Sequence, residues 1–464
     1  AKKRGMYFQP NYTAYRIPYS PKPSFLLIDF TLPDMHQTPP SPCINLDRLT
    51  EDIFTLARIG RSEEDNGLYR MAYTEADMEA RRWLKQRIEE AGLKAWTDGA
   101  ANVFGRLEGK DPEAPVLLIG SHTDTVPAGG PLDGALGVLV GLEVLRVLKE
   151  QGLQPERSIE VVSFSDEEGR FGGMLGSQAF TGDLTFQDLL EKTDPEGVPL
   201  QEHMRHVGLN PRGLLSARRD SDEIHSYLEL HIEQGPVLES LQKPIGIVDG
   251  IIGLFKSVIN IKGKANHAGT TPMKMRRDAF QGLSAFGDEI PRVLAEDGSD
   301  VSRATIGKVE LKPNFPHTIP GEAEFTLVVR DPSSEVMGNL ENAFRKVLAA
   351  TTRLRDLEFS YERISWIDPS VSDENLMKTL EEQAQKLNYP YEVMSSGAGH
   401  DAQFMARVAP TAMVFVPSIG SVSHSPAEWT DLQDIEKGAN LMLHSAVAIT
   451  QAKPTATKAS AQAS

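Results

Sequence analysis

The sequence predicts an α/β protein with a mainly parallel sheet, into which a smaller α+β domain is inserted. Short apolar runs alternate with amphipathic helical stretches in the first half of the chain, which is typical of buried parallel strands joined by helices. Near Gly250 the strands change to a partial alternation of apolar and polar residues, as in a sheet with one exposed face. After about Ile367 the first pattern returns, so the middle segment interrupts the larger domain.

The two ends of the chain show no useful periodicity. Residues 1–42 are dense in proline, and we expect a disordered or extended segment there, with a flexible tail at residues 453–464. The opening residues AKKR leave organellar targeting open. The segment has, however, neither an amphipathic Arg- and Ser-rich pattern nor an apolar core followed by a cleavage site.

Helix and strand signals follow in order through the larger domain, residues 43–247 and 365–452. Asn45 and Thr74 are good N-caps for two helices with apolar residues at helical spacing, and Gly92 stands where a left-handed C-cap residue belongs. The other expected elements are buried strands at 115–120, 158–165, 226–232 and 412–418, helices at 134–150 and 373–387, and a closing helix.

The inserted segment, residues 248–364, has its own order of elements. Strands are expected at 254–265, 322–331 and 357–366, and helices at 276–296 and 333–354. A β-α-β-β-α-β order predicts a ferredoxin-like domain in which one sheet carries two helices on one face.

Composition excludes several classes of function. The 464 residues carry a formal net charge of -17, which argues against binding to nucleic acid or to an anionic membrane surface. No apolar stretch reaches the roughly 20 residues that span a bilayer. The single cysteine, Cys43, excludes an intramolecular disulfide and a cysteine-based metal cluster, and it fits a reducing, cytoplasmic compartment. Any bound metal would therefore be held by His, Asp and Glu.

Polar residues gather where the expected strands end. Each alone has an ordinary explanation, since an aspartate can cap a helix, two glutamates can form a solvated turn, and a histidine can be hydrogen-bonded in a core. Because the carboxyl ends of parallel strands meet at one edge of a sheet, however, all of them can converge on one cleft. The residues in these positions are His122, Asp124, Asp133, Asp166, Glu167, Glu168, His231, Glu233 and His424.

This combination of side chains suits a metal centre. Imidazole and carboxylate without thiolate hold zinc or, in oxygen-rich sites, manganese or cobalt, and one carboxylate can bridge two ions. Paired ions lower the pKa of a shared water molecule and polarise a carbonyl oxygen. Of two adjacent glutamates, one can coordinate metal while the other acts as general acid and base.

Several stretches resemble the hydantoinase/carbamoylase amidases, a branch of the di-metal aminopeptidase and amidase superfamily. They are SHTDTVPAGGPLDGALGV, DEEG, ELHIEQGPVLE, NHAGTTPMKMRRDA and SHSPAE, and the resemblance covers roughly residues 44–450. Its most specific part is HIEQGP, because related exopeptidases usually carry a carboxylate in place of His231. The resemblance implies a di-metal aminopeptidase-like catalytic domain, with the inserted domain as a lid and dimerisation domain.

The resemblance also implies a ligand set for two divalent metal ions per subunit. His122 and His231 would be the terminal ligands of one ion. Glu168 and His424 would be those of the other, and Asp133 would bridge the two.

Three further residues would support catalysis by this resemblance. Glu167 would be the catalytic base, and Asp124 would orient the His122 ring. His267, in the inserted domain, resembles the histidine that stabilises the tetrahedral oxyanion and reaches across from the partner subunit of a homodimer. Taken alone, His267 would also suit a turn before Gly-Thr-Thr-Pro.

Four residues are implied as substrate contacts. Arg330 resembles the arginine that grips the substrate carboxylate, although Arg-Asp-Pro after a strand is also a common local ion pair. Gln234 would contact the polar end of the substrate. The family commonly has an asparagine before its IPG turn where this chain has His317, with Asn314 slightly earlier, so both are candidates. The loop DEEGRFGGMLGS is also one residue shorter than in many relatives, so the resemblance leaves the preferred substrate open.

These features predict a metal-dependent amidohydrolase that cleaves the ureido C–N bond of a small carboxylate-bearing substrate. An N-carbamoyl amino acid, as for an N-carbamoyl-L-amino acid hydrolase or a β-ureidopropionase, would give ammonia, carbon dioxide and the amino acid. Allantoate amidohydrolase is the nearest alternative, and an N-acyl amino acid hydrolase or a peptidase on the same scaffold is a second. A non-catalytic protein is disfavoured because all five candidate ligands and Glu167 are retained.

Overall fold

The computed structural model describes residues 41–451. The extended segment and the flexible tail expected at the two ends lie almost wholly outside these residues. None of the helices within the described range is long and apolar enough to cross a membrane.

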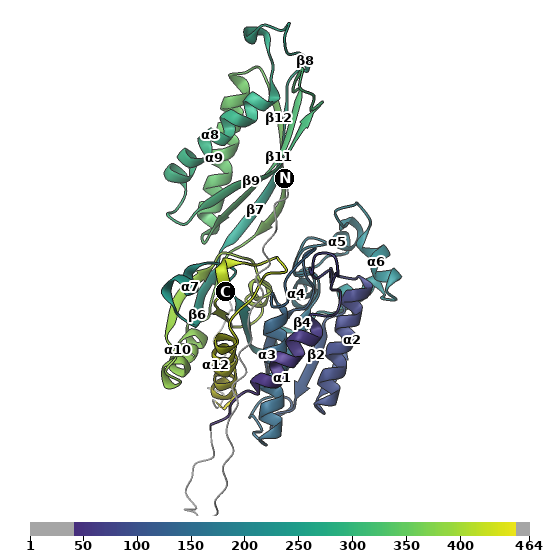
Figure 1. Cartoon of the computed structure of the whole chain (residues 1–464), viewed down its shortest axis with the longest axis vertical. Coiled ribbons are helices and arrows are strands. Elements are labelled where there is room, and N and C mark those ends of the chain that lie inside the picture. Colours follow the sequence, from purple (N-terminus) through teal and green to yellow (C-terminus); the bar gives the residue numbers. More distant parts are fainter. Residues whose placement is uncertain (1–40, 452–464) are drawn as a thin grey trace, which may run out of the picture. The chain divides into compact units, whose positions relative to one another are not determined.

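A nine-stranded mixed sheet forms the centre of the larger α/β part (Figure 1). Its strand order is β1-β2-β4-β3-β5-β15-β6-β13, with β14 paired to β6. The four central strands β4, β3, β5 and β15 are parallel to one another, and the outer pairings are mostly antiparallel. The bounds are β1 (Lys94–Thr97), β2 (Val103–Leu107), β3 (Val116–His122), β4 (Ile159–Phe164), β5 (Ile224–Ile232), β6 (Ile245–Ile251), β13 (Ser370–Val371), β14 (Tyr391–Ser396) and β15 (Thr411–Val416). The predicted mixed α/β fold with a parallel centre is confirmed.

Both faces of this sheet are buried, which explains why its central strands are continuously apolar. Leu117 and Ile119 point into a core shared with the helices α1, α2, α3, α10 and α12. Leu118 points to the opposite face and packs in a second core with Phe180. The helix bounds are α1 (Leu46–Leu56), α2 (Glu75–Glu90), α3 (Ala135–Glu150), α4 (Leu175–Thr181), α5 (Phe186–Glu191), α6 (Leu200–His206), α7 (Val237–Leu241), α10 (Glu374–Lys386), α11 (Ala402–Met405) and α12 (Leu432–Gln451), with 3-10 turns at 211–216, 221–223 and 419–421.

The helix caps agree with the sequence signals. Asn45 accepts a hydrogen bond from the Arg48 amide at the start of α1, and Thr74 caps α2 through the Asp77 amide. Gly92 follows α2 with a φ of 66°, a left-handed conformation that glycine adopts without steric cost. The N-cap position of α3, in contrast, is Gly134, and no side chain caps this helix. The Asp133 carboxylate is therefore not used as a helix cap.

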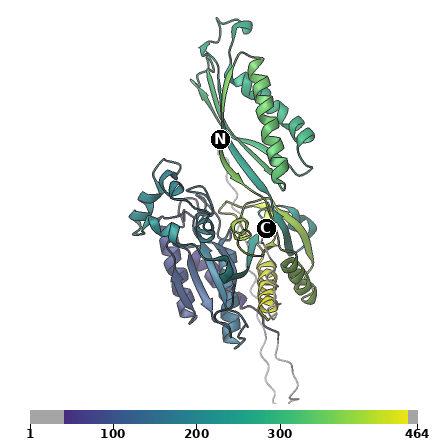
Figure 2. The ribbon, with the colours of Figure 1, turned by 180° about the vertical axis from the view of Figure 1, so that it is seen from behind.

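The middle of the chain forms a separate four-stranded antiparallel sheet with its own core. Its order is β12-β7-β11-β9, and α8 and α9 run along one of its sides in both views (Figures 1 and 2). The core contains Phe255, Phe286, Phe325 and Phe344. The bounds are β7 (Gly253–Lys262), β8 (Asn266–His267), α8 (Ala279–Asp297), β9 (Arg303–Lys312), β10 (Thr318–Ile319), β11 (Glu322–Asp331), α9 (Ser334–Arg353) and β12 (Glu358–Ile367), with a 3-10 turn at Met273–Met275.

This sheet has the expected β-α-β-β-α-β order, with the short pair β8 and β10 added at one end. The two ends of the inserted segment differ slightly from the predicted bounds, 248 and 364. Strand β6 belongs to the large sheet and continues to Ile251, so the small sheet begins with β7, and β12 continues to Ile367. The apolar alternation does not mark these points because β6 and β7 are separated by a single residue.

One glycine allows α3 to lie directly against the sheet. A Cβ atom added at Gly137 would lie 2.3 Å from the Leu230 carbonyl oxygen of β5 and 3.1 Å from the Ser121 Cβ. This close approach holds the start of α3 beside the carboxyl ends of β3 and β5, which is where the candidate ligands lie.

We therefore expect Gly137→Ala to destabilise the protein. The added methyl group forces the helix away from the backbone of β5, and overpacking of this kind costs about 1–3 kcal/mol. Chemical unfolding followed by circular dichroism measures the change. The matched control is Gly338→Ala in α9, where no atom lies within 4 Å of the added Cβ and where we expect a gain of about 0.4–1 kcal/mol. Equal stability of the two variants would contradict this account of the packing.

Candidate metal centre

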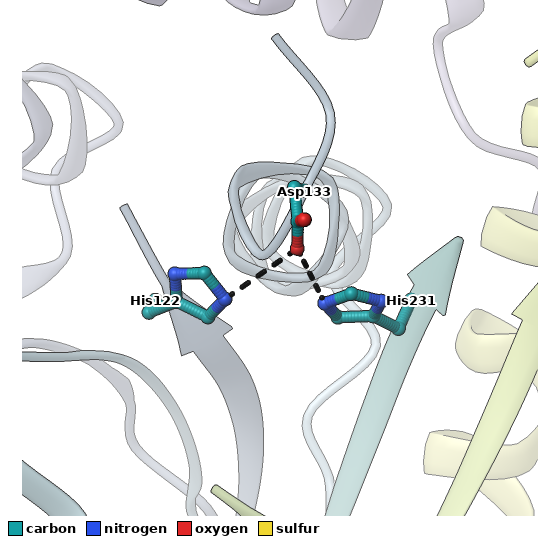
Figure 3. Close-up of side chains that lie close together, drawn as sticks. All are labelled: His122, Asp133 and His231. Carbon is teal, nitrogen blue, oxygen red and sulfur yellow. Dashed lines mark ion pairs between the residues drawn. The ribbon is translucent and has the colours of Figure 1, made fainter. Parts of the chain in front are cut away.

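Three side chains from separate parts of the α/β domain meet at the carboxyl edge of the large sheet (Figure 3). His122 is the last residue of β3, His231 lies near the end of β5, and Asp133 directly precedes the turn into α3. The Oδ1 atom of Asp133 lies 3.1 Å from His231 Nε2 and 3.8 Å from His122 Nε2. One ligand atom of each residue can thus surround a common point.

The second carboxylate oxygen of Asp133 faces a different group. His424 Nε2 lies 3.2 Å from Asp133 Oδ2 and 3.5 Å from Glu168 Oε2. These three residues also offer ligand atoms that lie within 4.8 Å of one another. The five predicted ligands therefore form two sets that share Asp133, one oxygen for each set.

The protonation and hydrogen bonding of these residues fit divalent metal ions. His122 Nε2 is buried and has no hydrogen-bond partner among the residues from 41 to 451. Burial lowers the pKa of His122 to about 4, so its ring is neutral and can act as a ligand near neutral pH. The two sets of imidazole and carboxylate groups have one carboxylate in common. Such ligands suit zinc, manganese or cobalt.

His231 is in a different protonation state when no metal is bound. Burial lowers the pKa of His231, but the hydrogen bond and the charge of Asp133 outweigh this effect and raise it to about 9. The raised pKa favours a protonated ring that pairs with the Asp133 carboxylate in the metal-free protein. A metal ion at this position would have to displace the proton on His231.

Glu167 lies beside the first ligand set, and its carboxylate is closer to the His122 ring than that of Asp133. Its Oε2 atom is 3.5 Å from His122 Nε2. Burial, followed by the negative charges of Glu168, Asp401 and Asp133, raises the pKa of Glu167 well above its usual range. A carboxyl group with a raised pKa can both accept and return a proton near neutral pH, as a general acid and base requires.

Asp124 was predicted to orient the His122 ring, and it contacts the ring through its main chain. His122 Nδ1 forms a hydrogen bond with the main-chain oxygen of Asp124, at 3.0 Å, and the carboxylate oxygen is 3.8 Å away. The Asp124 carboxylate instead accepts hydrogen bonds from the backbone amides of Glu167 and Glu168, at 3.4 and 3.2 Å. Its main chain thus orients the His122 ring, and its side chain fixes the turn that carries the two glutamates.

Glu428 is a supporting residue that the sequence analysis did not single out. Its Oε1 atom accepts hydrogen bonds from the backbone amides of Leu132 and Asp133, both at 2.9 Å. Its Oε2 atom accepts hydrogen bonds from Ser423 Oγ, at 3.0 Å, and from the His424 amide, at 3.3 Å. One carboxylate therefore connects the loops of two ligands. The signal was present, because Glu428 ends the SHSPAE stretch.

A polar cleft of about 370 Å³ opens over the two ligand sets. Two predicted substrate contacts, Gln234 and Arg330, lie in its wall. His400 also lies there, although the sequence analysis did not single it out, and its ring centre is 4.5 Å from that of His231. Gln234 Nε2 donates a hydrogen bond to Asp133 Oδ2 at 2.8 Å. The lining residues are Asp133, Glu167, Glu168, His231, Gln234, Arg330, Ala398, Gly399, His400, Ser421, Ser423 and His424.

The other predicted contacts, His267, Asn314 and His317, do not line this cleft. All three are exposed, and β8 and β10 pair so that His267 lies opposite Thr318. They lie beyond the end of β7, whereas Arg330 pairs with Leu254 at its start. At about 3.3 Å per residue, β7 separates the two places by roughly 25 Å. Within one chain, the structure does not bring these three residues to the candidate metal ligands.

The ring of His267 is nevertheless held in one orientation. Its Nδ1 atom accepts hydrogen bonds from the backbone amides of Gly269 and Thr270, at 3.1 and 3.2 Å. The neutral ring must therefore carry its proton on Nε2, where it is available as a donor to a group outside this loop.

Comparison with known proteins agrees with this architecture. Peptidase family M20/M25/M40 matches residues 118–448. The N-carbamoyl-L-amino acid amidohydrolase of Geobacillus stearothermophilus is 38% identical over 86% of this chain and 97% of its own length. The allantoate amidohydrolase of Bacillus subtilis is 36% identical over 85% of this chain and 95% of its own length. The crystal structure of a hydantoinase/carbamoylase family amidase from Burkholderia multivorans covers 90% of this chain and 100% of its own, with 36% identity and a TM-score of 0.80. The chain therefore belongs to peptidase family M20/M25/M40, a family of hydrolases, and within it to the hydantoinase/carbamoylase amidases.

Proposed function

We propose that this protein is a metal-dependent amidohydrolase that cleaves the ureido C–N bond of N-carbamoyl amino acids. The observation that carries the proposal is the Asp133 carboxylate, whose two oxygens face two separate ligand sets beside Glu167. Relatives of 38% and 35% identity are N-carbamoyl-L-amino acid amidohydrolases, and a β-ureidopropionase would carry out the same reaction on a β-amino acid derivative. The products would be the amino acid, ammonia and carbon dioxide.

The two ligand sets would hold two divalent ions, zinc, manganese or cobalt, with His122 and His231 on one, Glu168 and His424 on the other, and Asp133 shared. When bound, such ions make water more acidic and polarise the carbonyl group of the substrate.

Glu167 would move the proton in this reaction. Its carboxylate would accept a proton from water as the water oxygen attacks the ureido carbonyl carbon. It would then return the proton to the leaving nitrogen as the C–N bond breaks. The resulting carbamic acid decomposes to carbon dioxide and an amine, so that atoms and protons balance.

The substrate would be oriented by its carboxylate. Arg330 would bind that group through its guanidinium fork, and Gln234 would contact the ureido end. His267 would donate a hydrogen bond from Nε2–H to the developing oxyanion of the partner subunit's substrate in a homodimer formed through the four-stranded domain. Asn314 or His317 would reach the same substrate. This arrangement agrees with the separation of His267 from the cleft of its own chain.

A second substrate, allantoate, is favoured by one specific observation. The allantoate amidohydrolases of Bacillus subtilis and Escherichia coli are 36% and 35% identical to this chain. Allantoate carries two ureido groups and one carboxylate, so the same residues would bind it.

A cytoplasmic location belongs to the proposal as well. Cys43 is the only cysteine of the sequence and is exposed, which suits a reducing compartment.

The first test is ammonia release by protein reloaded with manganese, cobalt or zinc after metal removal. N-carbamoyl-β-alanine, several N-carbamoyl-L-amino acids and allantoate form the panel. We expect hydrolysis of one class, and a loss of about 10²–10⁴-fold in kcat in Glu167→Gln, because general acid and base catalysis contributes this much. The variant should retain its metal content. If every ureido compound is inert while N-acyl amino acids or dipeptides are cleaved, the proposed substrate class is wrong.

Metal affinity is expected to rise with pH up to about 9. His231 is protonated below its raised pKa of about 9 in the metal-free protein, so each ion bound there releases a proton, and a lower pH opposes binding. Calorimetric titration of the metal-free protein in buffers of different ionisation enthalpy measures this release.

The matched comparison for this test uses the two terminal histidines. His231→Asn should reduce proton release at neutral pH, whereas His122→Asn should not, because the pKa of His122 is about 4 and its ring is already neutral. Metal affinity that does not change with pH, with equal proton release in both variants, would refute the assignment.

The homodimer leads to a complementation experiment. Glu167→Gln and His267→Ala should each be inactive alone, because each lacks one part of every active site. In a mixture that exchanges subunits, half of the dimers combine the two chains and contain one intact site, which gives about a quarter of wild-type activity. Wild-type protein mixed with the double variant serves as the exchange control. Absence of any recovery despite proven exchange would show that His267 does not act across a dimer interface.

A further inference from the structure

Two arginines lie next to each other on neighbouring strands, at the end of the four-stranded sheet where Arg330 lines the cleft. Arg330 of β11 and Arg303 of β9 are directly opposite partners in the antiparallel register. Side chains at such positions point to the same side of the sheet, with their Cβ atoms about 5 Å apart. The two cationic groups therefore extend from the sheet together.

Both guanidinium groups also lie close to the same residue of the large domain, Gly397. Arg330 Nη1 donates a hydrogen bond to the Gly397 carbonyl oxygen at 2.8 Å. A Cβ atom at Gly397 would lie 3.4 Å from Arg303 Nη1. Gly397 directly precedes Ala398 and Gly399, which line the cleft. The second arginine thus reaches the rim of the cleft that contains Arg330.

The pair is electrostatically unfavourable as it stands. Like charges directly opposite each other in a sheet are destabilising, and burial together with the charge of Arg303 lowers the pKa of Arg330. Neither arginine forms an ion pair with any residue from 41 to 451, in contrast to many other arginines of the chain. A guanidinium group has five N–H donors, so the hydrogen bond to Gly397 leaves most of those on Arg330 free.

From this geometry we infer that Arg303 is a second carboxylate-binding residue, and that Arg303 and Arg330 together bind the carboxylate of the substrate. The inference rests on the proposed function and deepens it, because it assigns substrate selection to a residue of β9. A carboxylate has two oxygens and about four lone-pair positions, so it can accept hydrogen bonds from two guanidinium groups at once. It also removes the repulsion between them, and the resulting site selects acids over the corresponding neutral amides.

The test compares each N-carbamoyl amino acid with its neutral α-amide. In Arg303→Ala we expect the KM for the acid to rise about tenfold or more, as for the loss of a charge-assisted hydrogen bond. The kcat should stay within about threefold of the wild-type value, and the KM for the amide should hardly change. Arg303→Lys should be intermediate, because lysine keeps the charge but not the fork. The control is Lys308→Ala, which removes another exposed cation of β9 that pairs with Glu310 and should leave both KM values unchanged.

A double-variant cycle shows whether the two arginines share one carboxylate. The effect of Arg303→Ala on KM should be clearly smaller in an Arg330→Ala background than in the wild type, because residues that bind one group are coupled. An unchanged KM for the acid in Arg303→Ala, equal increases for acid and amide, or additive effects in the cycle would each overturn the inference.

Failure of the proposed function would look different. If the wild-type enzyme hydrolyses no ureido acid, the same acid and amide pairs are compared for the N-acyl or peptide substrate that it does cleave, because the inference concerns the carboxylate and not the bond that breaks. Loss of acid preference in Arg303→Ala would then support the arginine pair although the ureido substrate was wrong.

Discussion

The position of one carboxylate, that of Asp133, determines the rest of the candidate site. Its two oxygens face the histidine pair of β3 and β5 on one side and the Glu168 and His424 side chains on the other. A carboxylate can serve both sets only if its plane is fixed. Hydrogen bonds from Gln234 Nε2 and Ser423 Oγ to Asp133 Oδ2 hold that plane. Glu428 holds the backbone beneath it by accepting hydrogen bonds from the amides of Leu132, Asp133 and His424. The loop before α3 and the loop after β15 are thus positioned by a single side chain, so the spacing between the ligand sets is built into the fold.

The backbone around Asp133 is constrained for the same reason. Gly134 has a φ of 63°, and a Cβ atom there would lie 2.2 Å from His122 Nε2. Glycine is therefore required both by the left-handed conformation and by the space that the His122 ring occupies. The turn delivers Asp133 to the ligands without using its side chain as a cap, and Gly137 then lets α3 lie against β5. Local conformation and long-range packing thus act on the same carboxylate.

The sequence predicted most of what depends on local signals. Apolar runs, caps such as Asn45 and Thr74, and polar residues at strand ends are local features. The structure has the strands and the caps where these signals place them, and it brings the five candidate ligands together at one edge of the sheet. The parts that sequence reasoning missed depend on contacts between distant segments. Glu428 acts on a loop almost three hundred residues away, and the position of Arg303 beside Arg330 follows from the register of two strands. The sequence named Asp124 as the residue that orients His122, but it does not show which atom faces the ring, and in the structure this is the main-chain oxygen.

The geometry of the four-stranded sheet gives a physical reason for the homodimer that we propose. Arg303 and Arg330 lie at the end of this sheet near Gly397, and His267 lies beyond the opposite end of β7. The ten residues of β7 are an extended strand, whose length of about 30 Å cannot shorten without breaking its hydrogen bonds to β11 and β12. One such sheet cannot present both ends to the same small substrate. If His267 takes part in the reaction, as we propose, the oxyanion donor in each cleft must come from another chain while the carboxylate is bound by the cleft's own arginines. Each sheet would then contact two substrates, one at each end. Because the sheet is rigid, binding of a carboxylate at one end would also fix the position of His267 at the other.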